Sequence, residues 1–127
     1  MNKKGIDKER DLVNFLEFNG IPALRVAGSG GGTKLDRPDI IASDGKKVYC
    51  IELKSSDGNY IYIDQNQVKE LIRFSTRFNG MPVVAVKFNY LPYCFMSIND
   101  LNCTNKGNYK ITRDKAKRFK NRLILKS

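Results

Sequence analysis

The chain has 127 residues, 41% of them hydrophobic, and a formal net charge of +10, which fits a single compact domain over residues 1–127 and leaves no room for a second. It contains no His, which excludes a Ser-His-Asp triad, a His-Cys nucleophile pair and a His-ligated zinc site. Its three Cys, at positions 50, 94 and 103, are too few and too widely spaced to indicate a disulfide framework or a Cys-based zinc site.

The positive charge is concentrated in a C-terminal segment of about residues 110–127, where eight Lys or Arg accompany one acid, Asp114. Clustered positive charge favours a polyanionic partner such as nucleic acid, whereas the alternative is a basic surface that serves solubility. No apolar run is long enough to cross a membrane, and none follows the basic N-terminal residues as a secretory signal would require. We therefore expect a cytoplasmic protein without membrane partners, in the host cytoplasm if the gene is viral.

The predicted elements alternate between helical and extended patterns. In chain order they are a helix over 5–19, a strand over 21–27, a Gly-rich loop over 28–33, strands over 40–43, 47–54 and 60–63, a helix over 65–78, strands over 83–88 and 93–97, and a short edge strand over 109–112. From 114 onward the pattern predicts a short basic helix and a final apolar piece. This order predicts an α/β domain with a mixed central β-sheet flanked by helices.

The first hairpin carries unusual charge at its outer end. A two-residue turn at Asp44-Gly45 is predicted to join its strands, and counting outward from that turn places Asp39 opposite Cys50. Because side chains alternate between faces and cross-strand partners share a face, Asp39 should lie on the same face as Glu52 and Lys54. A turn of three residues would reverse this assignment.

Two carboxylates on one face repel each other unless a cation lies between them. Oxygen ligands without any His are those preferred by Mg²⁺ or Mn²⁺. A divalent ion at this place could bind a phosphate oxygen and activate a water, with Lys54 orienting the water or stabilising charge on the phosphate. The alternative is an exposed hairpin end with an ordinary pair of Glu52 and Lys54.

Two features outside the hairpin support a functional interpretation. Glu9 falls within the apolar stripe of positions 12, 13 and 16 on the first helix, so its carboxylate should face the protein body and need a partner. The alternative role for Glu9 is a favourable interaction with the helix dipole. Arg25 precedes the Gly-rich loop, whose backbone and Ser29 hydroxyl could approach a phosphate, unless the loop is only a flexible connector.

The charged residues also form a recognisable motif. Pro38-Asp39, twelve intervening residues, and Glu52-Leu53-Lys54 match the PD-(D/E)xK pattern of the restriction-endonuclease-like nucleases. The fuller set of matching segments is Lys4-Gly5, Glu9-Arg10, Arg25 to Gly30, Pro38-Asp39-Ile40, Glu52-Leu53-Lys54 and Tyr60 to Ile63. Over about residues 4–96 the sequence thereby resembles the archaeal-type Holliday junction resolvases, which are endonucleases that resolve four-way DNA junctions by paired nicks.

The resemblance implies a site and a substrate. It implies Mg²⁺, for which Mn²⁺ could substitute, held by Glu9, Asp39, Glu52 and the backbone carbonyl of Leu53, with no small-molecule cofactor. It implies catalytic roles for Lys54 and Ser29 beside those carboxylates. The residues that it implies in DNA binding are Lys4, Arg10, Arg25, Ser29, Gly30 and Lys34.

The resemblance further implies a homodimer, because two symmetry-related strands are cut. Phe74 and Phe78 extend the apolar surface of the helix over 65–78 beyond its core-facing stripe, which suggests an interface. The alternative is that a wide sheet covers both stripes. Two other functions stay open at this stage: a nicking enzyme or exonuclease of the same superfamily that acts on other DNA structures, and a non-catalytic basic DNA-binding module.

Overall fold

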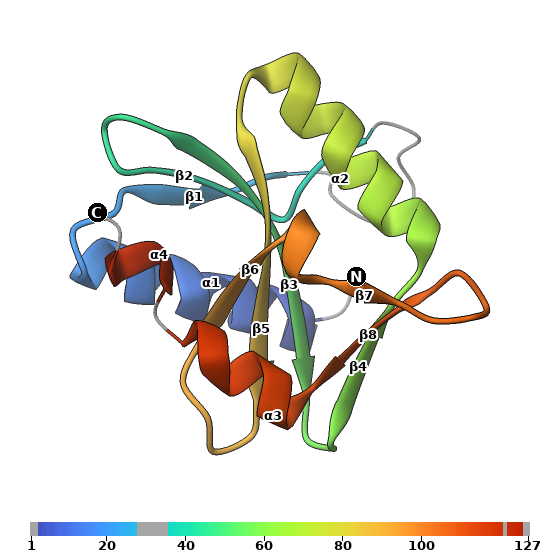
Figure 1. The fold of residues 1–127 in the computed structure, drawn as a ribbon. Coiled ribbons are helices and arrows are strands. Elements are labelled where there is room, and N and C mark those ends of the chain that lie inside the picture. The colour runs from blue at the N-terminus through green and yellow to red at the C-terminus, as the bar shows by residue number, and fades with distance from the viewer. Residues whose placement is uncertain (1–2, 28–35, 121, 126–127) are drawn as a thin grey trace.

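The computed structural model describes residues 3–27, 36–120 and 122–125, and Figure 1 shows their fold. The elements are α1 (Lys3–Phe18), β1 (Ala23–Arg25), β2 (Ile40–Ser43), β3 (Val48–Ser56), β4 (Tyr60–Ile63), α2 (Gln65–Phe78), β5 (Met81–Phe88), β6 (Cys94–Ser97), η1 (Ile98–Asp100), β7 (Asn102–Cys103), β8 (Tyr109–Thr112), α3 (Arg113–Ala116), η2 (Lys117–Phe119) and α4 (Arg122–Leu125). Within these ranges, no helix combines the length and the apolar character needed to cross a membrane.

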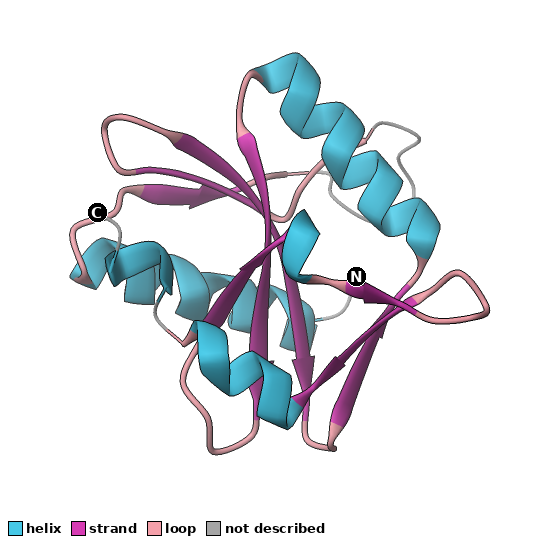
Figure 2. Cartoon of the chain, viewed as in Figure 1, coloured by secondary structure: helices cyan, strands magenta, loops and turns pink. Residues whose placement is uncertain are grey.

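The strands form two sheets, which Figure 2 distinguishes from the helices around them. The larger sheet has the order β1-β2-β3-β5-β6, in which β3 and β5 are parallel and the other neighbours antiparallel. The predicted mixed central sheet is therefore confirmed. The smaller sheet has the order β4-β8-β7, so β8 is a central strand, and the predicted edge position of residues 109–112 is wrong.

Helix α1 covers one face of the larger sheet. Leu12 and Leu16, one helical turn apart, are fully buried there among the side chains of β2, β3 and β5. The helix ends before Gly20, whose φ of +82° is accessible to glycine at little cost. Leu123 of α4 packs into the same cluster, so the end of the described chain returns to this core.

Helix α2 and the smaller sheet cover the other face. Asp64 caps α2 by accepting a hydrogen bond from the N–H of Asn66, and Gln67 completes a capping box. The helix ends at Asn79 in the left-handed conformation. A Cβ on the next residue, Gly80, would lie 2.7 Å from Sγ of Cys50, so a glycine is needed for α2 to connect to β5 this closely.

The turn of the β2–β3 hairpin differs from the prediction. Ser43 pairs with Val48, so the loop has four residues instead of two. Asp44 stabilises this longer loop, because its carboxylate accepts the N–H groups of Lys46 and Lys47 and the hydroxyl of Tyr49. These hydrogen bonds hold the pKa of Asp44 well below its usual range. The predicted pairing is therefore shifted by two residues, which preserves the face on which each side chain lies.

Candidate active site

The site forms where β2 and β3 separate. The ladder between them ends with Ile40 opposite Ile51, whereas β3 continues to Ser56 beside β5. Asp39, the next residue outward, donates its N–H to the carbonyl of Ile51 over 3.0 Å and accepts the N–H of Leu53 on its carboxylate over 2.8 Å. The Asp39 side chain thus takes the place of a backbone partner of β3, and this hydrogen bond fixes its carboxylate. The place where β2 and β3 separate, with Asp39, Glu52 and Lys54, is called the fork below.

Glu52 and Lys54 enter the fork from β3. The shifted register places Ile41, not Asp39 as predicted, opposite Cys50, and Asp39 lies beyond the last pair of this ladder. Nζ of Lys54 lies 3.8 Å from Oε2 of Glu52, and their side chains are only 25% and 19% exposed. The two carboxylates and the ammonium therefore converge at this end of the hairpin, as predicted.

The electrostatics of the fork disfavour two ionised carboxylates. Burial is the main cause that raises the pKa of Asp39 and that of Glu52 above the ordinary carboxyl range. Repulsion from Glu9 adds to the rise at Asp39, and repulsion from Asp39 adds to the rise at Glu52. Lys54 acts in the opposite direction on both groups, but it does not cancel the effect of burial. The fork is thus short of positive charge.

Glu9 lies nearby on α1 and has its own partner. Its Oε1 accepts a hydrogen bond from Nε of Arg25 over 3.2 Å, and both side chains are mostly buried. The sequence thus correctly placed Glu9 toward the protein body, and its partner there is Arg25. Among the described residues no three Asp, Glu, Cys or His side chains are close enough to hold a metal ion together. The carboxylates of Asp39 and Glu52 are the pair that the fold itself brings together.

The structure describes only some of the other predicted site residues. Ser29, Gly30 and Lys34 lie outside the described residues. Lys4 and Arg10 belong to α1, and Arg10 is exposed.

Phe74 and Phe78 stack on each other on α2 with ring centroids 5.1 Å apart, and Phe78 is 48% exposed. Phe74 packs at the edge of the core cluster beneath α2, so only part of this pair is needed there. A cavity of about 310 Å³ lies beside the two rings and is also lined by Asp36, Arg37 and Arg77.

Two contacts near the fork were not predicted. The guanidinium of Arg73 on α2 binds the carboxylate of Asp36 through two hydrogen bonds, of 2.9 and 3.3 Å. This pair ties α2 to the segment that leads into Asp39. On the other side of β3, Nζ of Lys8 donates to the Ser55 hydroxyl over 2.7 Å. Both contacts join residues that are distant in sequence, so no local pattern predicts them. The only available signal was that Asp36 lies close to the Pro38-Asp39 motif.

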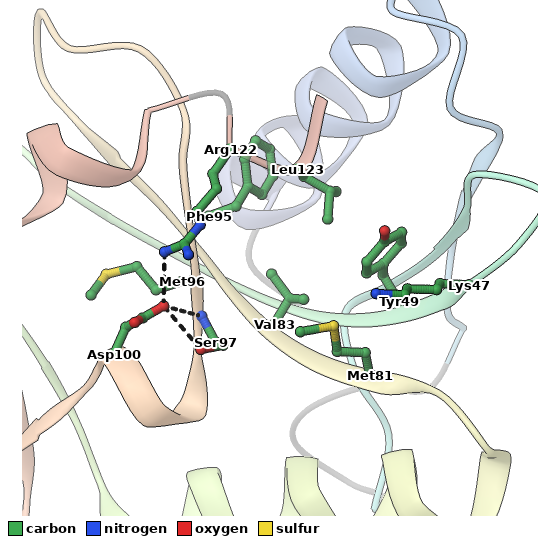
Figure 3. Close-up of a pocket in the computed structure, with 10 residues that line it drawn as sticks. All are labelled: Lys47, Tyr49, Met81, Val83, Phe95, Met96, Ser97, Asp100, Arg122 and Leu123. Carbon is green, nitrogen blue, oxygen red and sulfur yellow. Dashed lines mark hydrogen bonds and ion pairs between the residues drawn. The ribbon is translucent and has the colours of Figure 1, made fainter. Parts of the chain in front are cut away.

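The pocket in Figure 3 is not part of this site. It has a volume of about 80 Å³ and lies between β5, β6 and α4. Arg122 reaches Asp100 there over 3.5 Å, and Asp100 also accepts the N–H and hydroxyl of Ser97. These contacts fasten the C-terminal helix to the sheet, and none of the fork residues lines the pocket.

The fold and the fork together define a class of protein. A mixed sheet flanked by helices, with Pro38-Asp39 at the start of one strand and Glu52-Leu53-Lys54 in the next, is the arrangement of the restriction-endonuclease-like nucleases.

Comparison with known proteins identifies the family within that class. The family described as archaeal Holliday junction resolvase (Hjc) matches residues 1–126, and the chain belongs to it. The crossover junction endodeoxyribonuclease Hjc of Archaeoglobus fulgidus is 35% identical over 111 residues, which cover 87% of this chain and 80% of that protein. The corresponding Hjc of Methanocaldococcus jannaschii is 38% identical over 87 residues, 68% of this chain and 61% of that protein.

A solved structure shows the same fold. The structure of Archaeoglobus fulgidus Hjc, described as a Holliday junction resolvase from an archaeal hyperthermophile, matches with a TM-score of 0.78 and 31% sequence identity. The match covers 85% of this chain and 88% of that one.

Proposed function

We propose that this protein is a metal-dependent endonuclease that resolves four-way DNA junctions by paired, symmetric nicks. The observation that supports this most directly is the convergence of Asp39, Glu52 and Lys54 at the fork between β2 and β3. Membership of the Holliday junction resolvase family supports the substrate. The net charge of +10 suits a ligand that is held through its phosphates and its shape more than through its base edges.

The fork residues fit a hard divalent cation, for which we propose Mg²⁺ with Mn²⁺ as a substitute. Asp39 and Glu52 offer only oxygen atoms, which Mg²⁺ prefers, and it needs few protein ligands because it retains waters and binds substrate phosphates. The raised pKa values of both carboxyls mark a place where added positive charge is favourable. We also propose Glu9 and the Leu53 carbonyl as further ligands. Once bound, such an ion supplies a Lewis acid for a phosphate oxygen and a water.

The protein groups then have separate roles. Asp39 is held in one orientation by the N–H of Leu53, so a ligand at its carboxylate has a defined place. Lys54 carries an ammonium close to Glu52 that can stabilise the negative charge of the phosphate during cleavage. Arg25 holds the Glu9 carboxylate, which is close enough to act electrostatically on Asp39 and Glu52, and we propose that Arg25 also contacts the DNA backbone. Ser29, four residues after Arg25 in the sequence, is proposed to approach the scissile strand.

We propose that two copies of the chain assemble around the junction through the Phe74 and Phe78 surface of α2. A stacked aromatic pair with one ring half exposed is a common feature of protein interfaces. A two-fold dimer suits a junction in which two symmetry-related strands are cut. We also propose that the protein acts on this DNA in the cytoplasm, of a cell or of an infected host.

A labelled four-way junction incubated with the protein, with and without Mg²⁺, tests the proposal. We expect paired nicks at symmetric positions only when Mg²⁺ is present, and we expect Asp39→Ala to bind the junction without cutting it. Equal cutting of linear duplex or single strands would instead indicate a general nuclease of the superfamily. Strong, salt-dependent binding without any divalent-dependent cutting would indicate a non-catalytic DNA-binding module.

A further inference from the structure

The outer face of the smaller sheet carries side chains that its core does not require. Ile61, Ile63 and Ile111 point inward and are buried against the larger sheet. The residues that alternate with them therefore point outward. Lys110 of β8 pairs with Tyr62 of β4 on one side and with Asn102 of β7 on the other, so these three side chains lie on the same outer face. The outward-facing residues are Tyr60, Tyr62, Asn102, Lys110 and Thr112.

Two tyrosines dominate this outer face. Tyr60 is 51% exposed and Tyr62 is 58% exposed, and their ring centroids are 6.4 Å apart. Both rings are thus adjacent, open to solvent and mounted on a strand whose backbone is fixed by four cross-strand pairs with β8. Rigid, exposed aromatic rings on a sheet are the feature by which several nucleic-acid-binding domains stack on bases.

Lys110 adds a positive charge that lies over the ring of Tyr60. Its Nζ lies 4.1 Å from the centroid of Tyr60 and 5.8 Å from that of Tyr62. In the described part of the chain Lys110 forms no ion pair with a carboxylate. None of the five outward side chains is acidic, so the face offers flat rings for a base and an ammonium for its phosphate.

The face also lies within reach of the cleavage site. The turn after β3 leads directly into β4, so Tyr60 comes six residues after Lys54, which is at most about 22 Å of extended chain. That distance corresponds to about six base pairs of duplex. A DNA arm held at the fork between β2 and β3 therefore extends far enough to reach the outer face of β4 and β8.

We propose that Tyr60, Tyr62 and Lys110 form a platform that stacks on DNA bases exposed near the crossover of the junction, with Lys110 contacting the adjoining phosphate. The proposal rests on DNA as the substrate, which is part of the proposed function, but not on the metal or on the dimer. It adds a contact to bases, which are accessible only where duplex stacking is interrupted, and so favours branched DNA over continuous duplex.

The absence of Trp from the chain allows a direct test of this contact. Tyr60→Trp and Tyr62→Trp each introduce a single tryptophan, and Phe18→Trp places a matched control at the far end of α1, where Phe18 is 90% exposed. We expect junction DNA in EDTA to quench the tryptophan at 60 or 62 strongly and the one at 18 weakly. Equal quenching at all three positions, or none at 60 and 62, would overturn the proposal.

Affinity measurements separate stacking from charge. Tyr60→Ala should weaken junction binding about five- to 100-fold with an unchanged salt slope, whereas Tyr60→Phe, which keeps the ring, should bind like the wild type. Lys110→Gln should lower the salt slope by about one. Wild-type affinity of the Tyr60→Ala, Tyr62→Ala double variant would refute the platform. Because EDTA prevents metal-dependent cleavage, failure of the proposed cleavage activity would appear separately, in the wild type with Mg²⁺.

Discussion

Replacing Glu52 by Gln should stabilise the metal-free protein at alkaline pH. The change removes the ionisable group whose pKa is raised from 4.5 to about 8 by burial and by Asp39. Between these pH values the folded protein retains a proton that the unfolded chain has lost, so the folded state binds more protons and stability falls as pH rises. Glu52→Gln removes this dependence, and the variant should gain on the wild type as pH rises.

The size of this effect follows from the pKa shift. A rise from 4.5 to about 8 corresponds to a ceiling of about 5 kcal/mol at 1.36 kcal/mol per pH unit. The actual free-energy difference should be smaller than this ceiling for two reasons. The carboxyls of Asp39 and Glu52 interact, so the bound proton is distributed between them, and the Glu52 side chain retains 19% exposure to solvent. We therefore expect Glu52→Gln to exceed the wild type by about 1–3 kcal/mol in free energy of unfolding at pH 9.

Urea unfolding in EDTA at pH 5 to 9 measures this difference. Asp7→Asn, which removes an exposed carboxylate from α1, is the matched control and should follow the wild type across the range. Adding Mg²⁺ at 100 times its dissociation constant should raise wild-type stability by about 2.7 kcal/mol and Glu52→Gln by less. If the wild type and Glu52→Gln differ by the same amount at pH 5 and pH 9, the electrostatic account of the fork is wrong.

Three further single substitutions and one double reversal test other parts of the account. Lys54→Met should slow single-turnover nicking by about 100-fold or more and leave junction affinity within a few-fold, because the ammonium acts on charge that develops during cleavage; equal losses of rate and affinity would indicate a DNA-binding role instead. Asp36→Asn should lower the nicking rate about tenfold at unchanged affinity, because the pair with Arg73 holds the segment before Asp39. The double reversal Asp36→Arg, Arg73→Asp should restore part of that rate, and a wild-type rate for Asp36→Asn would show that the pair is dispensable. If the proposed dimer forms through α2, Phe78→Ser should lower the mass seen in light scattering toward that of a monomer, and an unchanged mass at micromolar concentration would count against this interface.

Local sequence patterns were sufficient for most elements and for the centre of the site. The bounds of the helix over 65–78 were predicted as the structure has them, because its ends at Asp64 and Asn79 depend on residues within one helical turn. The proximity of Asp39 and Glu52 was also predicted, although the turn that joins their strands was not. The carboxylate of Asp44 bonds two amides and a tyrosine hydroxyl, which favours a four-residue loop over the two-residue turn typical of Asp-Gly.

Contacts between distant residues could not be predicted in the same way. Arg73 and Asp36 are 37 residues apart, and Lys8 and Ser55 are 47 apart, so no periodic pattern relates them. The central position of β8 depends on its pairing with β4 and with β7, of which only β4 was predicted. Arg25 as the partner of Glu9 likewise required the packing of α1 against β1 to be known.

The most direct test of the central claim is the mapping of nicks on a mobile four-way junction by wild type and by Asp39→Asn in Mg²⁺. Asn retains the shape of Asp39 but not the negative charge that the fork concentrates. We predict paired, symmetric nicks by the wild type, and junction binding without nicks by Asp39→Asn. Nicking by Asp39→Asn at the wild-type rate would contradict the assignment of the fork between β2 and β3 as the active site.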